Sequence, residues 1–233
     1  MSWTLDNLDL ILRLTLEHLQ LSALPIVLGF VISIPLGWFA WRFKITRGLI
    51  LTVAGILYAI PSIALIVALP AILGTSPLSA GNLVIALTLY AVAIMARSVA
   101  DALGSVDPGV RQSATAMGYG GWRQFWGVEF PIAGPVLLAG LRVVAVSTIA
   151  LVTVGALVGV SGLGYLFTNG LQRRILEEVF AGVVTTMIVA LVIDALLVLL
   201  GRLLMPWTRT PRAMSRGPKS AAPSLEPAAG GAR

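Results

Sequence analysis

Long apolar stretches alternate with short polar ones along the chain, and this pattern predicts its architecture. Leu19–Trp41 carries no charged residue, and neither does Gly48–Ala96. A transmembrane helix needs about 20 apolar residues, so the second stretch is too long for one helix. The polar break Gly74–Ser79 divides it. We therefore expect a first span over Leu19–Trp41, a second over Leu49–Leu73 and a third over Ala80–Ala100.

Two further apolar stretches follow. Ile132–Val158 contains Arg142, and Val179–Leu204 contains Asp194. We expect these stretches to be the fourth and fifth spans, joined by a glycine-rich connection and the polar segment Asn169–Glu178. The sequence thus predicts an all-α, polytopic helical membrane protein with five transmembrane helices.

The two ends of the chain differ from this membrane part, which covers residues 19–207. Residues 1–18 are polar, with leucines every three or four positions. They form either an amphipathic helix lying on the membrane surface or the first turns of a longer first span. Residues 208–233 are rich in Pro, Ala, Gly and Ser. Such a segment cannot bury a core, so we expect a disordered tail.

Basic residues are concentrated in the first loop, Arg42–Arg47, and in the tail. An excess of lysine and arginine marks the cytoplasmic loops of membrane proteins. We therefore expect the C-terminus to lie in the cytoplasm and the N-terminus outside. On a membrane protein, the net charge of +6 is a topology signal, so it does not indicate nucleic-acid binding.

Composition narrows the possible chemistry. Hydrophobic residues make up 58% of the chain and charged residues 11%, against about 25% charged in soluble domains. Cysteine is absent and His18 is the single histidine, so we expect neither a thiol nucleophile nor a metal site, and no cofactor. His18 lies at a predicted membrane edge, away from any set of catalytic partners. An enzyme is not expected.

The polar segment Arg111–Pro131, here called the elbow, separates the third and fourth spans. It has helix-forming runs on either side of Gly118, and glycine accepts the positive φ that a sharp turn requires. Pro131 stands where the next apolar stretch begins, a place where proline is tolerated in a first helical turn. We expect a helix, a turn, a short helix and a return to the bilayer.

The elbow resembles the coupling loop of the inner-membrane permeases of ABC importers. The pattern of that family is Glu-Ala-Ala, three residues, Gly, nine residues and Ile-x-Leu-Pro, and every interval is kept here. Three positions match the pattern: Ala114, Gly118 and Pro131. Four positions differ from the pattern. Gln112 stands where the family has Glu, Ser113 where it has Ala, Val128 where it has Ile, and Phe130 where it has Leu.

In that family the loop docks on a separate ATPase subunit. The resemblance therefore implies that residues 105–131 are a cytoplasmic coupling loop, and that ATP is hydrolysed on another subunit. It also implies a second permease subunit, identical or paralogous, an extracytoplasmic substrate-binding protein and a place in the bacterial inner membrane, with membrane lipid around the chain and no nucleic acid bound.

From Leu19 to Pro206 the chain is most similar to the permeases for osmoprotectants such as glycine betaine, choline and carnitine. The segments that carry this likeness are Ala116–Tyr119, Trp122, Pro131–Pro135, Ala139–Arg142 and Gly162–Gly164. A permease for amino acids such as methionine is the alternative within the family. A secondary transporter or a membrane scaffold subunit is the alternative outside it.

Four residues are candidates for the translocation path: Tyr58, Pro61, Tyr90 and Asp194. Proline inside a membrane helix frees a backbone carbonyl, so Pro61 predicts either a bend that lines a cavity or a packing kink. The tyrosines are alternatively interfacial anchors.

Charge inside a membrane span is expensive, so each such residue should face protein or water. Asp194 is either a contact in the path or a buried hydrogen-bond partner between helices. Arg97 and Asp101 lie four residues apart on one helix and are expected to pair. Arg142 is a candidate for binding the backbone of the elbow.

Overall fold

The computed structural model describes residues 2–208, and that part of the chain is helical without any strand. The α-helices are α1 (Ser2–Asp6), α2 (Leu8–Arg42), α3 (Lys44–Ala59), α4 (Ser62–Leu73), α5 (Ala80–Gly104), α6 (Pro108–Ala116), α7 (Gly121–Gln124), α8 (Phe130–Val152), α9 (Gly164–Arg173) and α10 (Leu176–Leu204). A π-helical turn, η1 (Phe125–Glu129), joins α7 to α8, and the 3₁₀ turns are η2 (Thr153–Val158) and η3 (Pro206–Thr208).

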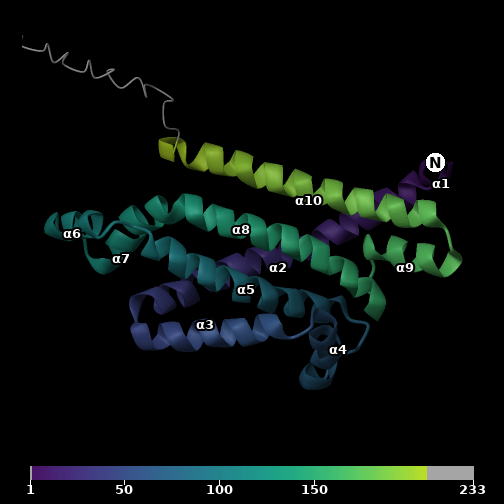
Figure 1. Ribbon diagram of the computed structural model, residues 1–233, viewed down its shortest axis with the longest axis horizontal. Coiled ribbons are helices and arrows are strands. Elements are labelled where there is room, and N and C mark those ends of the chain that lie inside the picture. Colours follow the sequence, from purple (N-terminus) through teal and green to yellow (C-terminus); the bar gives the residue numbers. More distant parts are fainter. Residues whose placement is uncertain (1, 209–233) are drawn as a thin grey trace, which may run out of the picture.

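The long helices lie side by side along the long axis of the molecule (Figure 1). Four helical segments are long and apolar enough to cross a membrane: Leu8–Arg42, Ala80–Gly104, Gly121–Val158 and Leu176–Leu204. The pair α3 and α4 counts as a fifth span only if its two halves are taken together, because they are bent by 102°. α6 and α7 lie at one end of the molecule, the elbow end, while α4 and α9 lie at the opposite end (Figure 1).

The second expected span, Leu49–Leu73, is broken at Pro61. Proline disfavours the helical conformation in the residue before it, and Ile60 is extended with ψ of 130°. The carbonyl of Ile60 accepts a hydrogen bond from the hydroxyl of Tyr90. By contrast Pro25 and Pro35 remain inside α2. The bend expected at Pro61 is therefore present, as a sharp corner with its freed carbonyl satisfied.

The structure decides between the two alternatives for residues 8–18, and it adds one helix that was not expected. α2 begins at Leu8 and runs through position 18 without a break, so residues 8–18 are the first turns of a longer helix. α9 was not expected, because its sequence mixes glycine and polar residues in a segment read as a connection. The tail lies outside the described residues apart from Thr208.

Small residues let α2 and α5 approach closely. A Cβ added to Gly29 would lie 2.4 Å from the Cβ of Ala91, and one added to Gly37 would lie 2.4 Å from the Cβ of Val99. Close approach through small residues is the usual way in which helices pack inside a membrane, where burial of apolar surface gives little drive. The two helices therefore pack backbone to backbone over two turns.

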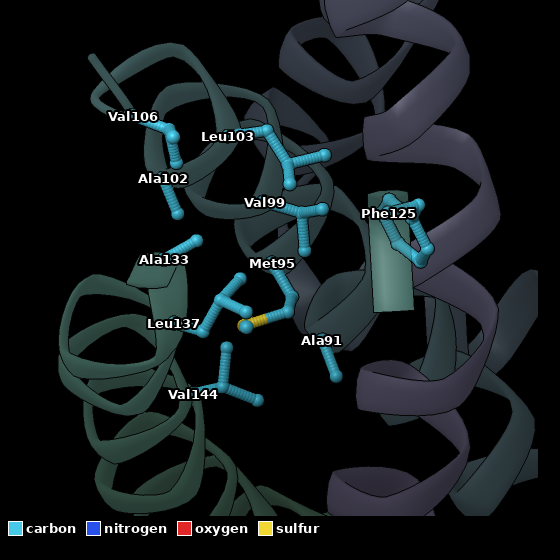
Figure 2. Close-up of a cluster of buried hydrophobic side chains, with 10 residues drawn as sticks. All are labelled: Ala91, Met95, Val99, Ala102, Leu103, Val106, Phe125, Ala133, Leu137 and Val144. Carbon is cyan, nitrogen blue, oxygen red and sulfur yellow. The ribbon is translucent and has the colours of Figure 1, made fainter. Parts of the chain in front are cut away.

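A buried cluster extends from this helix pair to the elbow. Side chains from α5 and α8 meet there, and Phe125 of η1 lies beside them (Figure 2). Met95 lies within the cluster with no exposed surface, and Phe130 packs against it. The elbow is thus anchored in the core of the bundle by its own aromatic residues.

His18 joins three segments at the end opposite the elbow. It is fully buried, its Nε2 lies 2.9 Å from the carbonyl oxygen of Ile149, and its Nδ1 accepts from the backbone N–H of Leu163 at 3.3 Å. These partners require the neutral ring with its proton on Nε2. Next to it, the hydroxyl of Ser161 donates to Glu17. His18 therefore has a structural role, tying α2 to the end of α8 and to the start of α9.

Candidate functional site

The elbow folds as its local sequence predicts. Asp107 caps α6 by accepting from the N–H of Gly109 at 2.6 Å, and Pro108 occupies the first turn. At the other end, Gly118 has φ of +81°. Its N–H donates to Thr115, and the N–H of Tyr119 donates to Ala114. This is a Schellman motif, in which the left-handed residue is usually glycine.

The residues of the coupling-loop pattern do not share one environment. Gln112, Ser113 and Gly118 are exposed on the surface. Ala114 is buried within this chain, so its small size serves the fold of the elbow itself. Val128, Phe130 and Pro131 are partly buried at the η1–α8 junction, where Phe130 packs against Phe125 with ring centroids 5.9 Å apart.

Sequence reasoning missed the ion pair that closes the elbow. Nε of Arg111 lies 3.2 Å from Oε1 of Glu129, and both side chains are largely buried. The same guanidinium donates to the carbonyl of Leu103 and lies 4.6 Å from the ring centroid of Trp41. Gln124 also donates to Oε1 of Glu129 at 3.1 Å. The sequence feature that could have indicated this ion pair is the presence of opposite charges, Arg111 and Glu129, near the two ends of the elbow.

Large apolar side chains of the elbow are exposed, and Trp122 and Trp126 line a hollow of about 700 Å³ against α2. Trp122 is 77% exposed and Met117 is 70% exposed, while Trp126 is exposed to a smaller extent. Exposed apolar side chains gathered on one element mark a surface that contacts protein or membrane. The elbow therefore combines a frame fixed to the bundle with exposed apolar side chains.

Three of the four candidate path residues lie together. The rings of Tyr58 and Tyr90 are 6.1 Å apart in an edge-to-face arrangement, next to the corner made by Pro61. Tyr58 also lines a cavity of about 280 Å³ between α3, α5 and α8. The tyrosines therefore belong to the helix break as well as to the cavity.

Asp194 lies elsewhere and has a partner of its own. Its two carboxylate oxygens accept from Nε and Nη2 of Arg142 at 2.6 and 2.7 Å, which joins α10 to α8. Arg142 therefore does not bind the elbow backbone as expected. The expected pair of Arg97 and Asp101 is also not formed, since Asp101 accepts from Arg47 at 3.4 Å. Both observed pairs join different helices, and they form because of the way those helices pack. The spacing of the residues along the sequence does not reveal such pairs.

Over the described residues 2–208, no three His, Asp or Glu side chains come together in a way that could hold a metal ion. The candidate site consists of the exposed apolar side chains of the elbow, a cavity beside Tyr58 and Arg97, and ion pairs that join the helices.

A family model and individual relatives both identify this chain as similar to inner-membrane transport proteins. Residues 22–210 match the model of a family described as "Binding-protein-dependent transport system inner membrane component". The chain is 34% identical over 197 residues to the osmoprotectant import permease protein OsmW of Salmonella typhimurium, covering 84% of this chain and 92% of that protein. It is 30% identical over 190 residues to the glycine betaine/carnitine/choline transport system permease protein OpuCB of Bacillus subtilis, covering 82% and 86%.

Solved structures show the same fold. A chain from the MetNI methionine ABC transporter in inward-facing conformations aligns with a TM-score of 0.72 at 24% identity, covering 88% of this chain and 99% of that chain. A chain from an amino acid ABC transporter with histidines aligns with a TM-score of 0.69 at 15% identity, covering 88% and 97%. The predicted all-α membrane fold is therefore confirmed.

Proposed function

Because the chain belongs to the family of binding-protein-dependent transport system inner membrane components, we propose that it forms the translocation path for an osmoprotectant such as glycine betaine, choline or carnitine. Membership confirms that the chain is a transport subunit, with ATP hydrolysis on a separate ATPase. The substrate class is supported by one observation, the identity of 30–34% to osmoprotectant permeases over more than four fifths of the chain.

The elbow is the proposed docking face for the ATPase. Its frame is fixed to the bundle by Arg111 and Glu129, and Met117 is exposed at the end of α6. A docked ATPase would cover this apolar side chain and push on α8 through the η1 turn. Gln112, Ser113 and Gly118 lie on the exposed side of this frame and are the pattern residues positioned to meet the partner.

The proposed orientation has five spans, the N-terminus outside and the elbow and C-terminus in the cytoplasm. Figure 1 supports it, since α1 lies at the end opposite α6 and α7, whereas the last turns of α10 lie at the elbow end. The basic segment Arg42–Arg47 lies at that same end, but it is not a loop as expected, because Arg42 ends α2 and Lys44–Arg47 form the first turn of α3 (Figure 1). One chain of this size does not enclose a path alone, so a second permease subunit completes it.

The test is ATP-dependent uptake by the assembled complex. The chain, its ATPase and its binding protein are reconstituted in vesicles and offered labelled glycine betaine, carnitine, choline or methionine. We expect uptake of at least one osmoprotectant, no uptake without ATP, and no uptake of methionine. Uptake of methionine alone would instead support an amino-acid permease, and ATP-independent uptake would support a secondary transporter.

A further inference from the structure

Two cavities on the α3 side of the bundle share Arg97 as a lining residue. One, of about 740 Å³, extends toward the elbow end and is lined by Lys44, Arg47 and the face of α3 that carries Gly48 and Gly55. The other, of about 280 Å³, is lined by Tyr58, Ser98 and Ser147 among others. Gly55 and Arg97 line both cavities, and no acidic residue lines either of them among the described residues.

The positive charge of Arg97 is not neutralised by an ion pair within the part of the chain that the structure describes. It lies inside the span α5, where an arginine side chain must face either another protein group or a water-filled cavity. Asp101, one turn away, pairs with Arg47, and none of the ion pairs found among the described residues involves Arg97. A guanidinium offers several N–H donors in a fixed plane that matches a carboxylate. Arg97 is therefore an anion-binding group that lines both cavities.

An aromatic surface lies in the same small cavity. Tyr58 is 57% exposed, and its edge-to-face contact with Tyr90 fixes the ring. Tyr90 is buried and does not line the cavity, which leaves Tyr58 as the aromatic group available to a ligand. An aromatic face attracts quaternary ammonium groups by cation–π interaction. The small residues Gly55 and Ala93 also line this cavity and leave room for a ligand between Arg97 and Tyr58.

We propose that this cavity is a substrate-contact site for zwitterions, with the carboxylate on Arg97 and the quaternary ammonium against Tyr58. The inference depends on the proposed function, and within it selects betaine-type and carnitine-type substrates over choline. Choline has no carboxylate, so its cation meets the charge of Arg97 without compensation. An unpaired charge of this kind discriminates effectively against choline and in favour of the zwitterions.

The first experiment compares uptake of labelled glycine betaine and choline by the reconstituted complex with an unchanged binding protein. Because a charge-assisted bidentate contact is strong, Arg97→Met should lower betaine uptake by about tenfold or more while leaving choline uptake unchanged or higher. Arg97→Lys should restore part of the betaine uptake. Tyr58→Leu should lower uptake of both substrates, and Tyr58→Phe should retain it.

The second experiment removes the binding protein from the comparison. Saturation-transfer NMR on the purified permease–ATPase complex should detect glycine betaine on the wild type, weaker contact with choline, and no betaine signal with Arg97→Met. A Cβ at Gly55 would meet no atom within 4 Å, so Gly55→Leu should fold and fill the cavity. It should abolish the NMR signal of betaine.

Assembly with the ATPase, followed by size-exclusion chromatography, shows whether each variant is folded. An assembled Arg97→Met complex that imports betaine normally, or loses betaine and choline uptake equally, contradicts the zwitterion site while leaving the proposed function intact. If the wild type imports no osmoprotectant at all, the proposed substrate class fails and the site with it.

Discussion

One guanidinium, that of Arg111, joins three parts of the molecule. It pairs with Glu129 at the start of α8, donates to Leu103 at the end of α5 and covers the ring of Trp41 at the end of α2. These contacts place α6 against the ends of three spans. A force on α6 is therefore transmitted to the bundle by one side chain.

Replacing Arg111 by alanine should leave Glu129 buried without a counter-charge. Breaking one side of a buried pair typically costs about 3–5 kcal/mol. We expect a lower unfolding temperature of the purified chain and less co-purified ATPase. Arg123→Ala is the matched control, since Arg123 only covers the ring of Tyr119 at 4.8 Å on an exposed surface. Equal effects of the two changes would contradict the role given to Arg111.

The pair of Arg142 and Asp194 predicts a different pattern of losses. Either Arg142→Met or Asp194→Leu alone leaves an unpaired charge between α8 and α10, so each should lower the yield of folded protein. The double change should recover much of that yield, because no charge is then left unpaired. If the double variant folds but fails in transport, Asp194 is a contact of the path as well as a helix tie.

Side-chain partners of this kind were the least predictable part of the site. The sequence marks Arg142 and Asp194 as unusual because charge inside a span is expensive. It does not reveal that they pair, since they lie 52 positions apart and meet only when α8 and α10 pack in one register. Arg97 and Asp101 had the correct spacing to pair, but packing of α3 on α5 brings Arg47 to Asp101 instead.

At the scale of elements, local chemistry was a better guide. Gly118 predicted the turn after α6. At Pro61 we expected a bend or a kink within one span, and the structure has a full break between α3 and α4. Pro25, Pro35 and Pro70 did not break their helices. The break at Pro61 coincides with a hydroxyl, that of Tyr90, that binds the freed carbonyl of Ile60. Sequence alone contains the proline but not this distant donor.

The turn at Gly118 gives a test of the elbow as a docking element. A side chain at its φ of +81° costs about 1 kcal/mol or more, but it would meet no atom of this chain within 4 Å. Gly118→Ala should therefore be mild, whereas Gly118→Asp places a charge on the docking face and should lower uptake and ATPase binding together.

Gly120→Asp is the control for that experiment. Gly120 has φ of −70° at the N-cap of α7, where aspartate is favoured. This variant should keep both assembly and uptake. Normal uptake with bound ATPase in Gly118→Asp would contradict the assignment of the elbow as the coupling element.

At the scale of the whole molecule, hydrophobic pattern predicted the order of the apolar segments, of which four are long helices and one is the bent pair α3 and α4. It placed the breaks at Gly74–Ser79 and at the elbow, where the structure also leaves the long helices. It left open whether residues 1–18 extend the first helix, and it missed α9, because polar residues that face a protein interior resemble those of a loop. His18 is an example: it is fully buried at a position assigned to the membrane edge.

The proposed topology is tested by reporter fusions. A reporter at Ser76, between α4 and α5, should report the outside, and one at Ser220, in the basic tail, should report the cytoplasm. A third reporter in the elbow, after Tyr119, should agree with the one at Ser220. Two reporters on the same side at Ser76 and Ser220 would overturn the five-span orientation.

The contact between Gly37 and Val99 has a consequence for how this chain can diverge. A methyl group at position 37 would overlap the side chain at position 99 and would also lie 2.8 Å from the backbone oxygen of Ala96, so a smaller residue at 99 does not make room for it. At Gly29 the only contact under 3.0 Å is with the Cβ of Ala91, so a larger residue there requires a smaller one at 91. Among relatives, position 37 should therefore remain glycine, whereas positions 29 and 91 should co-vary with nearly constant summed volume.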